Sequence, residues 1–133
     1  MINQIEEISL QEQFEAVIAL EDKLAIKDFL NNQNISDVAE LIYNNEEFES
    51  QIIANLSIHR AAGVFKILDL GEQKRIIKNL PVFKSAELLN ELPVDDRVAF
   101  LEELPTAAVR DLIKTLEPEE RKITLELLGY PEN

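Results

Sequence analysis

The sequence predicts an all-α protein, a solenoid of short antiparallel helices, on the strength of its composition and of a regular spacing of leucines. Apolar residues make up 46% of the chain but aromatic residues only 6%, so Leu, Ile, Val and Ala must fill the core. That composition favours helices over sheets. The chain has three Gly and five Pro, too few for the many tight turns of an all-β domain.

Leucine recurs at seven consecutive positions that are 12 residues apart. These periodic leucines are Leu56, Leu68, Leu80, Leu92, Leu104, Leu116 and Leu128. An apolar pair or near-pair precedes each of them by three to four residues, which places the pair and the leucine on one stripe of a helix. A fixed period of this kind indicates a repeated helix-turn unit. We expect four of these leucines to be buried: Leu80, Leu92, Leu104 and Leu116.

Residues that start or stop helices follow the periodic leucines. Pro81, Pro93 and Pro105 each come directly after one, and Ser57 and Asp69 occupy the same slot in earlier repeats. Each unit is therefore predicted to contain about nine helical residues and a three-residue turn. Helices this short are unstable alone, and short connections make neighbours roughly antiparallel, so the units should stack as hairpins into a superhelix.

The chain before the repeats also has a helical pattern. Apolar residues in 10–30 predict one longer helix or two short ones, and NNQN at 31–34 predicts a loop. Ser36 is predicted to cap a further helix that ends at YNNEE, residues 43–47.

The chain is strongly acidic, with a formal net charge of −13. Residues 1–55 carry 12 acids and two bases, whereas residues 56–133 carry 14 acids and 11 bases. This charge disfavours nucleic acid and anionic membranes as partners and favours cations or basic surfaces. The sequence has no signal-peptide pattern and no apolar run long enough for a membrane span, so we expect this segment to be soluble, without direct insertion into a membrane.

Catalytic residues are scarce. The chain has no Cys, and His59 is the single histidine. A Ser-His-Asp triad would need His59 as its base, but no glycine-flanked serine elbow accompanies it. We therefore do not expect an enzyme, and we interpret His59 as an ordinary residue in the first turn of a helix.

A family resemblance begins in the segment AELLNELPVDDRVAFLEELPTAAVRDLIKTLEPEERKITLELLGYPEN, residues 86–133. Its LP and EP turns, followed by paired acids and apolar stripes, resemble the cytosolic N-terminal domain of the MgtE family of magnesium transporters. The likeness covers roughly residues 36–133, and the closing LLGYPEN is similar to the lead-in to that family's paired CBS domains. A flagellar-motor-switch protein of the FliG type has related short-helix repeats, so an interaction module of that kind is the alternative.

The resemblance implies a regulatory, non-enzymatic part of a homodimeric magnesium channel at the cytoplasmic side of the bacterial inner membrane. In that family a right-handed superhelical domain packs on CBS domains of the same parent chain, and Mg²⁺ bound between their acidic surfaces favours the closed pore. Two parts follow for this chain, an N-terminal helical segment at residues 1–34 and the superhelical domain at residues 35–133. Because the ion lies at an interface, the isolated domain should bind Mg²⁺ only weakly.

The resemblance also implies a metal position at Asp95 and Asp96, in the stretch PVDDRVAF. The family pattern has a third acid where this chain has Ala99, and another acidic position falls on Gly63. The residues themselves allow a second interpretation, because carboxylates in the first turn of a helix are favoured by its free N–H groups and its dipole. Metal contact and stabilisation of the helix end are compatible roles.

Other charged residues form three groups. Glu102 and Glu103 are interpreted as a solvated helix face, with an acidic surface toward a partner as the alternative. Glu46, Glu47 and Glu49 have the same two interpretations. The basic residues are expected to pair with acids of neighbouring helices rather than to bind phosphate, since no Gly-rich loop accompanies them; they are Arg60, Lys66, Lys74, Arg75, Lys78 and Lys84.

Overall fold

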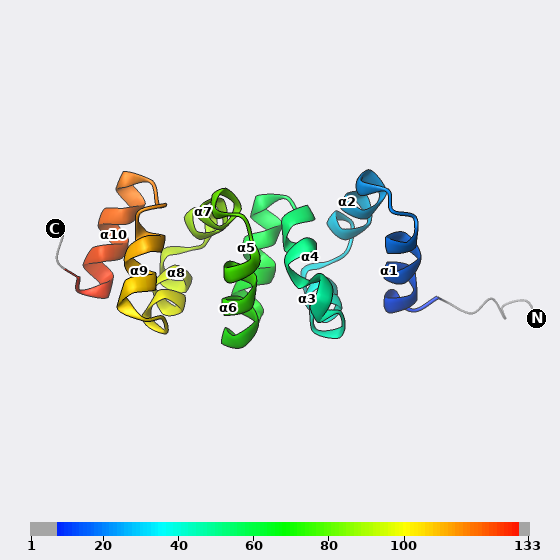
Figure 1. Ribbon diagram of the computed structural model, residues 1–133, viewed down its shortest axis with the longest axis horizontal. Coiled ribbons are helices and arrows are strands. Elements are labelled where there is room, and N and C mark those ends of the chain that lie inside the picture. The colour runs from blue at the N-terminus through cyan, green and yellow to red at the C-terminus, as the bar shows by residue number, and fades with distance from the viewer. Residues whose placement is uncertain (1–7, 131–133) are drawn as a thin grey trace, which may run out of the picture.

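The structure, a computed structural model, describes residues 8–130, and this range is all-helical, with ten α-helices, one short 3-10 helix and no strand. The helices follow one another along the long axis of the molecule, so α1 and α10 lie at opposite ends (Figure 1). Their bounds are α1 Leu10–Ala19, α2 Lys23–Asn31, α3 Ile35–Asn44, η2 Glu46–Phe48, α4 Glu49–Asn55, α5 Ile58–Ile67, α6 Leu70–Asn79, α7 Val82–Glu91, α8 Val94–Glu102, α9 Thr106–Ile113 and α10 Pro118–Leu128. No helix in this range is both long and apolar enough to span a bilayer.

Six of the seven periodic leucines lie in the turns between helices, and the seventh, Leu128, is the last residue of α10. Leu80 and Leu92 end α6 and α7 with extended backbone, and the proline that follows each one explains this, because a residue before proline is pushed out of the helical region. Pro81 and Pro93 then begin the next helices. The turn is therefore two residues long, one fewer than predicted, and α5, α6 and α7 each have ten residues.

The N-terminal segment forms two short helices, α1 and α2. Asn34, not Ser36, caps α3: its side-chain oxygen accepts a hydrogen bond from the Asp37 amide at 2.8 Å. The predicted loop at 31–34 begins one residue later, since Asn31 still belongs to α2. Residues 131–133, at the end of the motif that resembles a CBS lead-in, lie outside the described range, as do residues 1–7 of the N-terminal segment.

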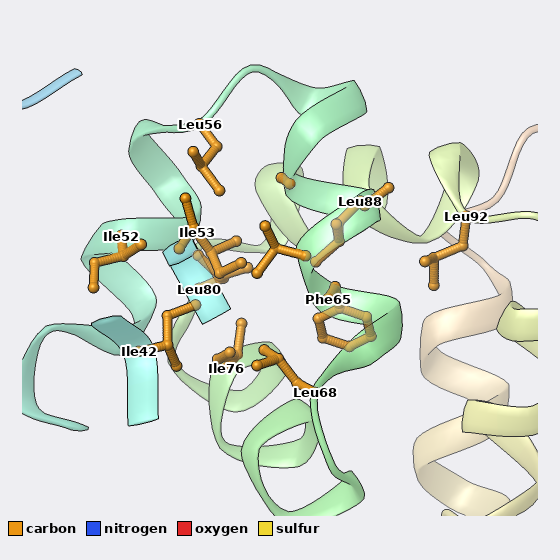
Figure 2. Packing of buried hydrophobic residues seen from close by; sticks show 14 of the residues in the cluster. Ile42, Ile52, Ile53, Leu56, Phe65, Leu68, Ile76, Leu80, Leu88 and Leu92 are labelled. Carbon is orange, nitrogen blue, oxygen red and sulfur yellow. The ribbon is translucent and has the colours of Figure 1, made fainter. Parts of the chain in front are cut away.

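Alternate helices pack side by side and bury one continuous core. α3 packs on α5, α5 on α7, α4 on α6 and α8 on α10. The core runs from Phe14 to Leu116, and Figure 2 shows its middle, where side chains from α3 to α7 meet. Leu80, Leu92 and Leu116 are buried as predicted, but Leu104 is only half-buried. The connection from α8 to α9 has an extra residue there, Glu103 to Pro105, which breaks the two-residue spacing.

A polar residue repeats with the same period of 12. At the fourth position of several helices a side chain donates to a carbonyl at the end of the preceding helix, which satisfies acceptors that a helix terminus leaves free. The bonds are Gln73 to Phe65 (2.9 Å), Ser85 to Ile77 (3.4 Å), Arg97 to Leu89 (2.7 Å) and Arg121 to Leu116 (3.2 Å). The leucine period therefore has a hydrogen-bonded counterpart that fixes α6, α7, α8 and α10 against the segment before each of them.

Candidate functional site

Asp95 and Asp96 lie in the first turn of α8. Pro93 occupies the N-cap and offers no side-chain cap, so the first amides of α8 remain available to negative charge. Asp95 is exposed and Asp96 half-buried. Neither carboxylate is hydrogen-bonded or ion-paired to another residue of the described range. The helix N-terminus therefore stabilises both charges through its dipole alone.

The two aspartates face different surroundings. Asp96 lines a shallow pocket of about 170 Å³ between α8 and the α5–α6 pair, and Asp95 does not. Ala99, which holds the place of the missing family acid, lines the same pocket, as do Glu103 and Lys66. An acid at position 99 would have joined Asp96 there. Without it, the pocket pairs one aspartate with one glutamate and a lysine.

The carboxylate oxygens available here could supply only some of the ligands of a metal ion. Magnesium prefers oxygen ligands and keeps several of its waters, so one or two carboxylates from a domain can suffice. Within residues 8–130 no three His, Cys, Asp or Glu side chains are arranged to hold a metal ion. Lys66 beside Asp96 also opposes a cation in the pocket. The residues present fit an ion shared with a second surface, with Asp95 as the more accessible donor.

The position of the second missing family acid, Gly63, lies at a different contact between helices. Gly63 is in α5, and a Cβ atom added there would lie 3.5 Å from the Ile35 side chain of α3, an ordinary contact distance. Position 63 therefore faces the contact between α3 and α5, whereas Asp96 faces the pocket beside α8. The two acids that the family resemblance implies at positions 63 and 99 would therefore lie at two separate places.

Glu102, Glu103 and His59 lie at the surface. Both glutamates are exposed at the end of α8. His59 is in the first turn of α5, as predicted, and its Nδ1 is 3.0 Å from Glu91 of α7. Since its side chain is 90% exposed, this histidine has neither a buried base nor a nucleophile beside it.

Glu49 corrects the expectation that Glu46, Glu47 and Glu49 form one solvated face. Glu49 is only 6% exposed, and Glu72 of α6 is 2% exposed. Arg75 connects the group: its Nε lies 3.1 Å from Glu49, and its Nη2 lies 2.5 Å from Glu72 and 3.7 Å from Glu46. Burial, together with a hydrogen-bonding contact with Glu49 and its charge, raises the pKa of Glu72 to about 7, and Arg75 offsets this only in part.

Arg97 is a second buried charge that sequence reasoning missed. It is 1% exposed, and its guanidinium makes five hydrogen bonds. Three go to carbonyls at the end of α7, and two reach α10: Leu89 (2.7 Å), Asn90 (3.1 Å), Leu92 (3.0 Å), Glu120 (2.9 Å) and Thr124 (3.0 Å). A guanidinium has five N–H donors, so this one is fully satisfied. Arg97 connects three helices directly behind the two aspartates.

The basic residues fall into different groups than predicted. Arg75 pairs with acids of neighbouring elements as expected, and Lys84 pairs within its own helix with Glu87 at 3.8 Å. Arg60 instead donates to the carbonyl of Gln33, before α3. Lys74 and Lys78 of α6 line an apolar groove against α8 and α9, together with Ile77, Phe100, Leu104, Pro105, Ala108, Asp111 and Leu112.

Three comparisons with known proteins bear on this geometry. A family model described as the MgtE intracellular N domain matches residues 33–133. A solved structure of the cytosolic domain of the Mg²⁺ channel MgtE in complex with ATP has the same fold, with a TM-score of 0.81, 23% sequence identity and 92% of this chain covered. This chain spans 51% of that structure's chain, about half its length. No curated protein sequence matches.

Proposed function

Because this chain belongs to the family of MgtE intracellular N domains, we propose that it is the magnesium-sensing regulatory domain of a magnesium channel. It has no catalytic role in this proposal. It packs on CBS domains of the same parent chain, in a homodimer at the cytoplasmic side of the bacterial inner membrane. Mg²⁺ at that contact favours the closed pore.

One observation carries the proposal: two aspartates at an open helix end have no partner within the described range. Neither Asp95 nor Asp96 forms an ion pair within the described range, and Asp95 lies outside the pocket that Lys66 lines, so its charge in particular is available to a second surface. The net charge of −13 makes contact with another acidic surface unfavourable unless a cation lies between them. The incomplete donor set is therefore consistent with an ion that two surfaces share.

The energetics follow from differential affinity. An ion that binds the docked state and not the separated one stabilises docking by RT ln(1 + [Mg]/Kd), about 2.7 kcal/mol at 100 times Kd. Asp95 contributes in two opposing ways, since its carboxylate repels the partner without the ion and holds the ion when it is present. Removing it should weaken the dependence of docking on magnesium and raise the concentration needed to close the pore.

The test uses the full-length parent protein and protease protection of the chain that follows residue 133, titrated with Mg²⁺. Asp95→Ala should move the midpoint to higher Mg²⁺, and a tenfold shift would correspond to about 1.4 kcal/mol. Asp96→Ala should move it less, because Asp96 faces the pocket beside Lys66. Asp111→Ala is the matched control, an exposed aspartate of α9 whose nearest base is Lys114 at 3.9 Å.

The possible outcomes distinguish an error in the assigned ion site from an error in the proposed regulatory role. An unchanged midpoint for Asp95→Ala together with a shift for Asp96→Ala or Glu102→Ala would move the ion to another acid of α8. A titration that no acid of this domain shifts would refute the proposed regulatory role. In the isolated domain, calorimetry should detect only weak Mg²⁺ binding, since the remaining ligands belong to the partner surface.

A further inference from the structure

Two glutamates from different helices are buried where α4 packs on α6. Glu49 is the first residue of α4 and Glu72 lies in the first turn of α6. They are 6% and 2% exposed, although carboxylates are almost never buried this deeply without a matching charge. Their single base is Arg75, whose side chain is 48% exposed. The half-exposed guanidinium of Arg75 is therefore the shared counter-ion of two buried carboxylates and of the exposed Glu46.

The pair lacks hydrogen-bond donors. Arg75 donates to one oxygen of each carboxylate, Oε1 of Glu49 and Oε1 of Glu72. The other oxygen of each, Oε2, is buried and has no partner among the residues that the structure describes. Two ionised carboxylates can only accept, so neither can satisfy the other. If one is protonated, its O–H becomes the missing donor and one negative charge disappears from the buried contact.

We propose that Glu49 and Glu72 hold one proton between them, and that this proton-binding site makes the packing of α4 on α6 depend on pH. When the proton leaves, two buried anions face each other with one shared arginine, and the contact loosens. The effect is distinct from the magnesium site, because it uses other residues and requires no divalent ion. It would give the domain a second input, the proton concentration of its compartment.

The charged groups around the pair support a single proton. Within the described range, the groups that act on Glu72 are Glu49 of α4 and Arg75 of α6, while Glu46 of η2 contacts Arg75 and not the pair itself. At the start of α6, Asp69 caps the Glu72 amide with its own carboxylate and also contacts the Tyr43 hydroxyl of α3. With Arg75 as the one base, a second ionised carboxylate remains uncompensated. The raised pKa of Glu72 agrees with this arrangement.

The experiment is a pH titration of the whole 133-residue chain, labelled with ¹³C at glutamate side chains and followed by NMR in the presence of a chelator. One glutamate should titrate with a midpoint near 7, well above the ordinary value of a glutamate side chain. Glu72→Gln should remove the high midpoint. Glu49→Gln should lower it, because the amide donates to Glu72 without carrying charge. Glu46→Gln, the matched control on the exposed side of Arg75, should leave it in place.

Amide hydrogen exchange tests whether loss of the proton loosens the packing of α4 on α6. After correction for intrinsic rates, the opening equilibrium of α4 and α6 should rise about tenfold from pH 6 to pH 8 in the wild-type chain, as the bound fraction falls across a pKa near 7. Glu72→Gln should flatten this change. The proposal is wrong if every wild-type glutamate titrates below about pH 5.5, or if opening of α4 and α6 is the same at both pH values. Both outcomes are read from the wild type, so a variant that fails to fold cannot obscure them.

Discussion

Within residues 8–130, charge is buried in two places, and its hydrogen bonds are complete in only one of them. Near the C-terminal end, Arg97 makes five hydrogen bonds that join α7, α8 and α10. Nearer the N-terminal end, Glu49 and Glu72 share Arg75 and leave one oxygen each without a donor. The arginine also replaces contacts that a helix end would otherwise make with water, whereas the carboxylates compete for one donor. A fully satisfied buried charge fixes a structure, and a partly satisfied one makes it depend on conditions.

Arg97→Met should have the largest effect of the changes considered. It removes the donors from three carbonyls at the end of α7 and from Glu120 and Thr124, while keeping much of the apolar volume. Loss of one partner of a buried, hydrogen-bonded charge costs about 3–5 kcal/mol. Chemical denaturation should show that loss. Arg110→Met, an exposed position on α9, should stay within about 0.5 kcal/mol and serves as the control. A smaller loss for Arg97 would mean that water replaces the arginine at the end of α7.

A change of pH should have the second-largest effect, and it should act on the region of Glu49 and Glu72 and not on that of Arg97. The pKa of Glu72 in the folded state, about 7, lies above its ordinary value of 4.5, so the folded chain holds a proton that the unfolded chain releases. The stabilisation from that proton is fully present below about pH 4.5 and is lost as the pH rises through about 7. One pKa unit corresponds to about 1.4 kcal/mol, so the loss amounts to at most about 3 to 4 kcal/mol.

The measurement is the free energy of unfolding of wild type and Glu72→Gln at a series of pH values. The difference between the two chains should change over pH 4.5 to 7 and be flat above it. Arg97→Met should lower stability by the same amount at every pH in this window, because an arginine does not titrate there. A parallel pH profile for wild type and Glu72→Gln would mean that the buried pair holds no proton.

Composition and periodicity were enough to predict the helices, their approximate length and the positions of most turns. The period of 12 placed Leu80, Leu92 and Leu116 in the core because apolar spacing reports directly on burial. Leu104 is the exception and is only half-buried, and its place in the period of 12 did not distinguish it from the buried leucines. The right-handed sense of the superhelix stays a prediction.

Charged residues were harder to place, because a single sequence does not tell a buried charge from a solvated one. Arg97 and Glu72 look like ordinary helix-surface residues until the helices that cover them are in position. One signal was available for Arg97: it lies five residues after Leu92, the slot that Gln73, Ser85 and Arg121 occupy in other repeats. Asp95 and Asp96 came from the family resemblance, and the division of the chain at residue 35 also stays a prediction.

Asn31 and Asn90 allow the two regions to be compared at the level of single hydrogen bonds, because each makes the same pair of bonds in its own region. Asn31, at the end of α2, donates to the Asn55 carbonyl at 3.0 Å and accepts from the Ser57 amide at 2.9 Å, across the turn between α4 and α5. Asn90 of α7 makes the equivalent bonds across the turn between α9 and α10, to Thr115 at 3.3 Å and from Glu117 at 2.8 Å. Alanine at either position removes both, so each should cost about 1–2 kcal/mol.

Replacement of each of these two asparagines with aspartate should reveal how strongly the charges around each turn act on that position. Asn→Asp keeps the acceptor and loses the donor, so the hydrogen-bond loss is equal at both sites and any difference between the variants is electrostatic. An aspartate at position 31 would lie one helical turn after both Lys27 and Asp28, whose charges offset each other, whereas at position 90 it would lie near Glu87 and Glu117. The change at 90 should therefore cost more, by about 0.5 kcal/mol. Denaturation in low and high salt measures the difference, which should shrink as salt screens the charges. Equal costs at both ionic strengths would show that the surface charges around these turns do not distinguish the two regions, and that the contrast between them is confined to the buried groups.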